Sequence, residues 1–277
     1  MAHSFPWVKG HGTRNDFVLL PDPDGSVHGD LDPALVRWLC DRRGGIGGDG
    51  VIRVIRSAAY APGQAQAGAA EWFMDYRNAD GSPSQMCGNG IRVFARHLVQ
   101  EGLVKPDEPI RIGTRGGTRT VQLDGGRSTV DMGAAQLLGA TEITVGDRRW
   151  PATRVSIGNP HAVTFVRDLA EAGPLLDPPG HDAGHFPDGV NVEFVRVVGI
   201  GHIAMRVHER GSGETRSCGT GACAAAVAAI VQAGWQVPSQ VRVDVPGGTL
   251  HVGWHADGRA ELTGPAAIVT RGEWLGQ

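Results

Sequence analysis

The segment Met86-Cys87-Gly88-Asn89-Gly90 has a counterpart in Ser217-Cys218-Gly219-Thr220-Gly221, and together these two segments decide the fold. Residue 218 lies 131 positions after residue 87, and each C-G-x-G motif is followed by an apolar stretch that ends at a glycine. Nine residues before each cysteine stands a polar residue directly after an apparent strand, Asn78 in the first half and Glu209 in the second. A repeat of this length predicts two similar domains, because the repeats of solenoid proteins are much shorter.

Apolar periodicity predicts three helices. Pro33–Arg42 and Gly90–Glu101 carry apolar residues at helical spacing along one face. Gly221–Gln232 is apolar almost all round and has no charge, which is typical of a helix buried on every side. Gly102 and Gly234 are expected to end the second and third helices, since glycine adopts the left-handed conformation that stops a helix.

Short apolar or alternating runs, separated by Gly, Pro and Asp, predict strands throughout the chain. These runs are Asp16–Leu20, Val51–Ile55, Trp72–Tyr76, Arg119–Leu123, Ser128–Met132, Thr153–Ile157, Ala162–Val166, Asn191–Val197, His202–Val207, Gln240–Val245 and Thr249–Trp254. The Ala/Gly/Gln-rich stretch Ser57–Ala70 is expected to be an inserted surface loop. The overall expectation is an α/β (α+β) fold of two pseudo-symmetric domains, each a mostly antiparallel sheet or barrel wrapped around a central helix.

One glycine-rich stretch resembles a dinucleotide-binding fingerprint without its context. Gly45-Ile46-Gly47-Gly48-Asp49-Gly50 satisfies G-x-G-x-x-G, a pattern that binds nucleotides when a strand precedes it and a helix follows. Here the order is reversed, with the helix Pro33–Arg42 before it and the strand Val51–Ile55 after it. A tight helix-to-strand turn is therefore expected.

Composition excludes several classes of protein. With 277 residues the chain exceeds the usual size of one core, and 41% apolar and 20% charged residues are typical of globular proteins. No apolar stretch is long enough for a membrane helix, and Met1–Gly12 lacks the apolar core of a signal peptide. A net charge of −3 gives no electrostatic footprint for nucleic acid. We expect a cytoplasmic protein that binds neither membrane nor nucleic acid.

Lysine is nearly absent, which bears on the cofactor. Lys9 and Lys105 are the only lysines in the sequence, and neither lies in the Gly/Ser-rich setting that binds the phosphate of pyridoxal phosphate. No His or Cys stands at zinc-ligand spacing from either C-G-x-G motif. We therefore expect no cofactor and no metal.

Cys87 and Cys218 have the setting of reactive thiols. A cysteine at a helix start is close to unpaired backbone N–H groups and to the positive end of the helix dipole, both of which stabilise a thiolate. Racemisation at an amino-acid α-carbon needs a base on one face and an acid on the other, and two thiols can exchange these roles. The alternative is that free cysteines pack as small hydrophobes, and this is the interpretation for Cys40 and Cys223.

Polar residues next to glycines or at strand ends accompany the two cysteines. Asn15, Asn78, Asn159 and Asn191, with Glu209-Arg210, could supply amides and a guanidinium for the ammonium and carboxylate groups of an amino acid. Asparagines beside glycine also occur as plain turn residues, so that alternative stays open. His161 and Glu209 are the candidates for adjusting the thiol pKa values.

These motifs together resemble diaminopimelate epimerases, over about residues 5 to 272. The resemblance rests on Gly12-Thr13-Arg14-Asn15-Asp16-Phe17-Val18, Asn78-Ala79-Asp80-Gly81-Ser82, Met86-Cys87-Gly88-Asn89-Gly90-Ile91-Arg92, Gly158-Asn159-Pro160-His161, Gly189-Val190-Asn191-Val192-Glu193, Glu209-Arg210-Gly211 and Ser217-Cys218-Gly219-Thr220-Gly221. The related proline racemases and hydroxyproline epimerases typically carry His at the position of Asn89.

The resemblance implies interconversion of LL- and meso-diaminopimelate for lysine and peptidoglycan synthesis, with Cys218 accepting and Cys87 donating the proton in the LL-to-meso direction. It implies that His161 and Glu209 modulate the thiols. The substrate contacts that it implies are Asn15, Asn78, Gly88, Asn89, Asn159, Asn191, Glu209, Arg210, Gly219 and Thr220. It further implies a homodimer, and two domains that close on the substrate: residues 1–129 with 264–277, and residues 130–263.

The sequence departs from the family at three places, one of which is the Ser57–Ala70 insertion, without counterpart in shorter relatives. Many members have Phe-Asp-Gln where this chain has Gly48-Asp49-Gly50, so the glutamine that reaches the substrate is missing. Thr270 stands where many relatives place a dimer-contact tyrosine. Racemisation of another amino acid, a thiol redox sensor and a non-catalytic amino-acid-binding protein remain as alternatives.

Overall fold

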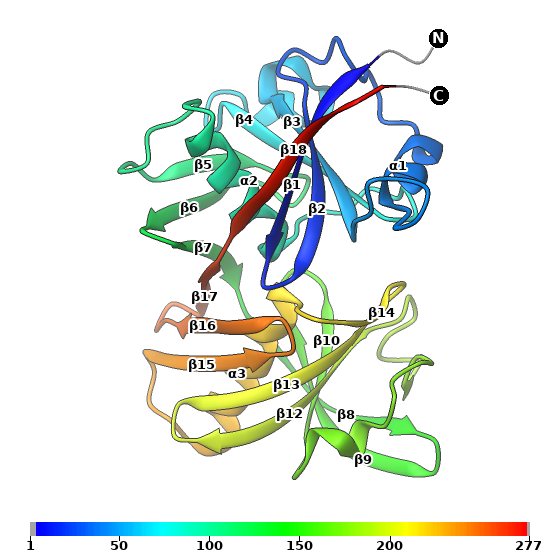
Figure 1. The fold of residues 1–277 in the computed structure, drawn as a ribbon. Helices are drawn as coiled ribbons and strands as arrows, with labels where there is room; N and C mark the ends of the chain where they lie inside the picture. Colours follow the sequence, from blue (N-terminus) through cyan, green and yellow to red (C-terminus); the bar gives the residue numbers. More distant parts are fainter. Residues whose placement is uncertain (1–3, 276–277) are drawn as a thin grey trace. The chain divides into compact units, whose positions relative to one another are not determined.

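The computed structural model describes residues 4–275, which form two compact units (Figure 1). Unit 1 combines the chain up to Val130 with the segment from Pro265 onward, and unit 2 comprises Asp131–Gly264. The expected mixed α/β fold is confirmed, since both units are built mainly of strands with few helices. No helix within the described residues is long and apolar enough to cross a membrane.

Unit 1 is a curved set of strands around one helix. Its strands are β1 (Phe5–Gly12), β2 (Asn15–Pro21), β3 (Gly50–Arg56), β4 (Trp72–Asn78), β5 (Ile110–Gly113), β6 (Arg119–Asp124), the start of β7 (Arg127–Ala134) and β18 (Ala267–Trp274). Neighbouring strands follow the order β18-β1-β2-β3-β4-β5-β6-β7, antiparallel except at β2–β3 and β4–β5. Helix α2 (Gly88–Gln100) contacts β1 to β6 and β18, so it is the central helix of this unit.

Unit 2 repeats this arrangement. Its main strands are β8 (Gln136–Val145), β9 (Arg148–Ser156), β10 (Pro160–Phe165), β12 (Asn191–Gly199), β13 (His202–Glu209), β15 (Ser239–Val245), β16 (Gly248–Trp254) and β17 (Arg259–Pro265). They neighbour one another in that order, antiparallel except at β10–β12 and β13–β15. The succession of strand orientations is therefore the same in both units. Helix α3 (Gly219–Ala233) contacts β9, β10, β12, β13, β15 and β16.

Short elements complete the fold. They are α1 (Pro33–Cys40), the 3₁₀ helices η1 (Ser57–Ala59), η2 (Ala61–Gln66) and η3 (Leu169–Ala172), and the strands β11 (Gly180–His181) and β14 (Gly213–Thr215). The glycine-rich stretch 45–50 joins α1 to β3, as predicted. An added Cβ at Gly45 would lie 2.0 Å from the Trp38 carbonyl oxygen, so this turn closes too tightly for any other residue.

The predicted central helices are confirmed, and both begin two residues earlier than expected. Cys87 and Cys218 are the N-caps, because each sulfur accepts the backbone N–H three residues later. The expected stops also occur, with positive φ at Gly102 and Gly234. Every residue of α3 up to Ile230 is buried, as its uniformly apolar sequence predicted.

Two expectations need correction. Ser57–Ala70 is not a plain loop: it carries η1 and η2, and Tyr60 packs edge-on against Phe73 with ring centroids 5.4 Å apart. Helix α1 ends at Cys40 because the next residue, Asp41, has extended backbone. The strands that correspond to the predicted runs are present, but β1, β5, β8, β11, β14, β17 and β18 were not predicted.

Candidate active site

Cys87 lies in unit 1 at the start of α2. Its Sγ accepts the Gly90 N–H at 3.3 Å, and its thiol donates toward Asn15 Oδ1 at 3.8 Å. The side chain is only partly buried. The N-terminal end of a helix presents backbone N–H groups, so the start of α2 is suited to a carboxylate.

Asn15 is held in a fixed orientation beside this thiol. Its Nδ2 donates to Asp49 Oδ2 at 2.7 Å, and its Oδ1 accepts from Asn89 Nδ2 at 3.1 Å. Asn89 Oδ1 in turn accepts from Arg92 Nη2 at 2.9 Å, and Arg92 Nη1 donates to the Gly88 backbone carbonyl at 3.0 Å. Asp49 and Arg92 were not among the predicted site residues. For Arg92, the available signal in the sequence was a charged residue on the otherwise buried start of α2.

A strained turn places Asn15. Thr13 and Arg14 connect β1 to β2 with φ of 48° and 62°, a conformation that is costly for a β-branched residue. Thr13 is buried, and its hydroxyl accepts from Arg92 Nη2 at 3.3 Å. The buried arginine therefore contacts both the turn and the helix that meet at Asn15.

Asn78 and Gly50 lie opposite each other on β4 and β3. Asn78 Nδ2 donates to Ser82 Oγ at 3.0 Å. An added Cβ at Gly50 would lie 2.6 Å from Tyr76 Cε2 and 2.5 Å from the Arg77 carbonyl oxygen. The Tyr76 ring thus occupies the space that a glutamine side chain would need, which is the physical reason for glycine at this position.

Cys218 lies in unit 2 at the start of α3 and is 4% exposed. Its Sγ accepts the Gly221 N–H at 3.3 Å and lies 3.5 Å from Thr220 Oγ1. Burial raises the pKa of this thiol well above its usual value, and the carboxylates of Glu209 and Glu193 raise it further. The Thr220 hydroxyl and the Gly221 N–H act in the opposite direction.

Glu209 is the last residue of β13 and hydrogen-bonds Cys218. Its Oε1 also accepts from the Thr215 hydroxyl. Burial raises the pKa of Glu209, which brings this carboxyl closer to neutral pH as a proton acceptor.

His161 and Asn159 lie at the start of β10 and just before it. His161 Nδ1 lies 2.7 Å from Glu193 Oε1, and His161 Nε2 lies 3.0 Å from Asn159 Oδ1. Asn159 Nδ2 donates to Thr220 Oγ1 at 3.3 Å. Glu193 was not predicted as a site residue, although an acidic residue on the otherwise apolar start of β12 was an available signal.

Asn191 begins β12, and Arg210 directly follows β13. Asn191 is buried, and its Oδ1 accepts the Arg210 backbone N–H at 2.9 Å. Arg210 Nη1 donates to the Asp188 carbonyl at 3.1 Å, while the rest of this exposed guanidinium is available for a carboxylate.

The predicted residues therefore form two clusters, one in each unit. Cys87, Gly88, Asn89 and Asn15 are together in unit 1, with Asn78 at the end of β4. In unit 2, Cys218, Gly219, Thr220, Asn159, His161 and Glu209 are together, with Asn191 and Arg210 at neighbouring strand ends. Cys40 and Cys223 are buried in the faces of α1 and α3, and burial raises the pKa of Cys40 to about 12.

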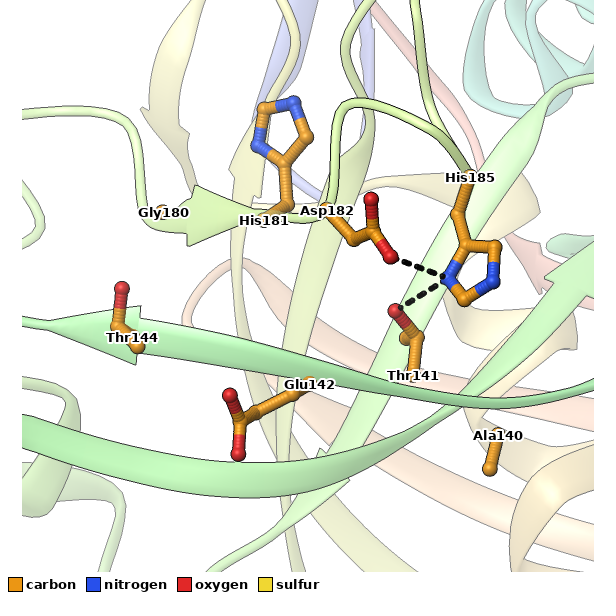
Figure 2. A pocket seen from close by; sticks show the side chains of 8 residues that line it. All are labelled: Ala140, Thr141, Glu142, Thr144, Gly180, His181, Asp182 and His185. Atoms are coloured by element: carbon orange, nitrogen blue, oxygen red, sulfur yellow. Dashed lines mark hydrogen bonds and ion pairs between the residues drawn. The ribbon is translucent and has the colours of Figure 1, made fainter.

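A separate hollow of about 640 Å³ in unit 2 includes none of these residues (Figure 2). It lies between β8 and the segment after β11, where His185 Nδ1 is 3.3 Å from the Asp182 carboxylate and 3.1 Å from Thr141 Oγ1. Among the described residues, no group of three or more His, Cys, Asp or Glu side chains could hold a metal ion. The hollow is therefore not a metal centre of that kind.

Comparison with known proteins shows the family of this chain. The sequence profile of the family described as Diaminopimelate epimerase matches residues 7–138 and 153–269. The chain belongs to this family. Diaminopimelate epimerase from Streptomyces coelicolor is 55% identical over 99% of this chain and 96% of its own length. The enzyme of the same name from Thermobifida fusca is 50% identical over 96% of this chain and 97% of its own.

Solved structures show that more distant proteins share the fold of the family. A phenazine biosynthesis protein of the PhzF family from Bacillus anthracis superposes with a TM-score of 0.73 at 14% identity, covering 99% of both chains. A hydroxyproline epimerase from Agrobacterium vitis gives a TM-score of 0.71 at 17% identity, covering all of this chain and 94% of the other. At these identities the likeness concerns the fold alone.

Proposed function

We propose that this protein interconverts LL- and meso-diaminopimelate, with Cys87 and Cys218 as the acid–base pair. The observation that carries the proposal is that each cysteine caps the central helix of its own unit, at the same place in the same strand order. A duplicated fold that presents one thiol in each half is suited to a carbon centre that must be approached from two faces.

The proton balance is simple. One thiolate removes the α-proton, which forms an S–H bond and leaves a carbanion; the other thiol gives its proton to the opposite face, which forms the new C–H bond. The sulfurs exchange protonation states, so each direction of the reaction regenerates the pair for the other. The N–H groups that begin α2 and α3 can hold the substrate α-carboxylate and stabilise the charge that develops next to it.

Glu209 is suited to deprotonate the buried thiol of Cys218. Because burial raises the pKa of its thiol, Cys218 carries its proton before substrate binds. Glu209 hydrogen-bonds the thiol and can accept this proton, which produces the thiolate that removes the α-proton of the substrate. In the LL-to-meso direction we assign the base to Cys218 and the acid to Cys87.

Substrate recognition is assigned to the polar groups of the two clusters. Asn15, Asn78, Gly88 and Asn89 in unit 1, with Asn159, Asn191, Glu209, Arg210, Gly219 and Thr220 in unit 2, would bind the ammonium and carboxylate groups. Closure of the two units on the substrate, a homodimer, a cytoplasmic location and a role in lysine and peptidoglycan synthesis all belong to this proposal.

The proposal is tested by epimerase assays on Cys87→Ser and Cys218→Ser. Serine keeps the size and hydrogen bonding of each helix cap but is too weak an acid for the proton transfer, so both variants should lose nearly all turnover. Wild-type turnover in both would overturn the mechanism. A panel of amino acids, scored by α-deuterium incorporation, tests the substrate: preferential exchange in an amino acid other than diaminopimelate would overturn that assignment.

A further inference from the structure

Equivalent glycines in the central helices of the two units have different neighbouring side chains. The first turn of each contains a glycine, Gly90 in α2 and Gly221 in α3. The atom nearest to an added Cβ is Ile52 Cδ1 at Gly90, at 3.1 Å, and Glu193 Oε1 at Gly221, at 2.7 Å. One unit therefore packs an aliphatic side chain against this turn, whereas the other packs a carboxyl group.

A carboxyl group at this place is costly for stability. Glu193 is 0% exposed, and its Oε2 has no hydrogen-bond partner among the described residues. An unpaired, buried carboxylate oxygen is strongly disfavoured, whereas the carbonyl oxygen of a protonated acid is much less so. Since the other unit satisfies the same packing with isoleucine, core packing alone does not account for Glu193.

Glu193 begins a continuous chain of side chains that ends at the sulfur of Cys218. The contacts run from Glu193 Oε1 to His161 Nδ1 (2.7 Å), from His161 Nε2 to Asn159 Oδ1 (3.0 Å), from Asn159 Nδ2 to Thr220 Oγ1 (3.3 Å), and from Thr220 Oγ1 to Cys218 Sγ (3.5 Å). His161 is also 0% exposed, so water does not compete for this part of the chain.

The directions of these hydrogen bonds follow from the Asn159 amide, whose Nδ2 donates to Thr220 Oγ1 and whose Oδ1 faces His161 Nε2. Because an amide oxygen only accepts, His161 Nε2 carries hydrogen and donates to it. His161 Nδ1 then either accepts from a protonated Glu193 or, in an imidazolium, donates to an ionised one. With Asn159 as its donor, the Thr220 hydroxyl has its own hydrogen left for the sulfur.

We propose that Glu193 is a positioning residue for Cys218, which fixes the tautomer of His161 and thereby directs the Thr220 hydroxyl onto the sulfur. This inference rests on the proposed role of Cys218 as a proton-transferring thiol. The hydroxyl stabilises the thiolate, so the chain partly offsets the burial that disfavours ionisation of Cys218.

The alternative is that Glu193 acts on Cys218 only through its charge, and the two effects have opposite signs. The carboxylates that act on the thiol are Glu209 at the end of β13 and Glu193 on β12, and His161 on β10 contacts Glu193 and acts electrostatically on both. Removing a negative charge would lower the thiol pKa. Removing the anchor of the hydrogen-bond chain would raise it.

The test is a titration of the Cys218 thiolate by its ultraviolet absorbance in the full-length Cys87→Ser protein, with Cys87→Ser/Cys218→Ser as the baseline. Glu193→Leu removes the chain and should raise the pKa of Cys218 by about one unit, a roughly tenfold loss of thiolate at a given pH. Glu193→Gln can still donate to His161 Nδ1 and should remain close to the parent. An unchanged or lowered pKa in Glu193→Leu would overturn the proposal.

Thr220 provides an independent pair of variants if Glu193→Leu does not fold. Thr220→Val should raise the pKa of Cys218 by a similar amount, and Thr220→Ser should restore it. Adding Glu193→Gln or Glu193→Leu to Thr220→Val should then cause no further rise, and an additive shift would refute the chain. Because the titration needs no substrate, it stands or falls separately from the epimerase assays.

Discussion

Tyr76 Cε2 would lie 2.6 Å from a Cβ at Gly50, so the ring of one residue excludes any side chain at the other. The two residues lie on paired strands, β4 and β3, and Gly50 is directly opposite Asn78. In this protein, the Tyr76 ring fills the space beside Gly50. A glutamine could not be restored here by a single substitution.

Gly50→Ala should consequently destabilise the protein by about 1–3 kcal/mol, because the added methyl overlaps the ring and the Arg77 carbonyl oxygen. Thermal unfolding measures the effect. Gly68→Ala is the matched control, since nothing lies within 4 Å of a Cβ at Gly68. Equal stability of the two variants would show that the ring moves aside freely.

Asp16 makes stability depend on pH in the acid range. Burial alone would raise the pKa of Asp16, but hydrogen bonds and charges from Arg42 and Lys9 hold it at about 2, below its usual 3.8. A carboxylate with a lowered pKa stabilises the folded state above its unfolded-state pKa, and that stabilisation is lost as pH falls through the folded-state value.

Asp16→Asn should therefore cost about 1–2 kcal/mol at neutral pH, a figure that allows for the exposed position of Arg42. The difference from wild type should shrink as pH falls from about 4 toward about 2. Urea unfolding at a series of pH values measures it, with the exposed Asp147→Asn as control. A difference that stays constant over this range would contradict the assignment.

Glu209→Gln tests the proton acceptor for Cys218. The amide keeps a hydrogen bond to the thiol but cannot take its proton, so kcat should fall by roughly 10²–10⁴. Circular dichroism checks that the fold is retained. Glu214→Gln is the control. Glu214 lies on β14, which pairs with β13, and its carboxylate forms an ion pair with Arg206 instead of contacting the thiol. A kcat close to that of wild type in Glu209→Gln would exclude this role.

The sequence predicted what depends on local pattern. Alternating apolar runs located the strands with a buried face, and the uniformly apolar α3 was predicted as a buried helix. Strand β8 was missed because nearly all of its first residues are exposed, so its sequence lacks the alternation of apolar and polar residues that indicates a strand. Strand β18 was missed for the same reason.

The site was predictable where residues carry their own chemistry and not where three-dimensional packing decides. Both cysteines could be found because the motif and the helix start are adjacent in sequence. Glu193 could be noted as an acidic residue in a buried strand but not as the partner of His161, because that contact depends on β10 lying beside β12. The role of Arg92 likewise follows only from its hydrogen bonds to Asn89 and Thr13, and Thr13 is far from Arg92 in the sequence.

Solvent deuterium exchange shows directly whether each thiol serves one face of the α-carbon. Cys87→Ser and Cys218→Ser are each incubated in heavy water with LL- and with meso-diaminopimelate, and α-deuterium incorporation is measured for each isomer. Cys87→Ser keeps the base for the LL-isomer, so we expect Cys87→Ser and Cys218→Ser to show opposite preferences between the isomers, with epimerisation lost in both. The same residual exchange of both isomers in both variants would contradict it.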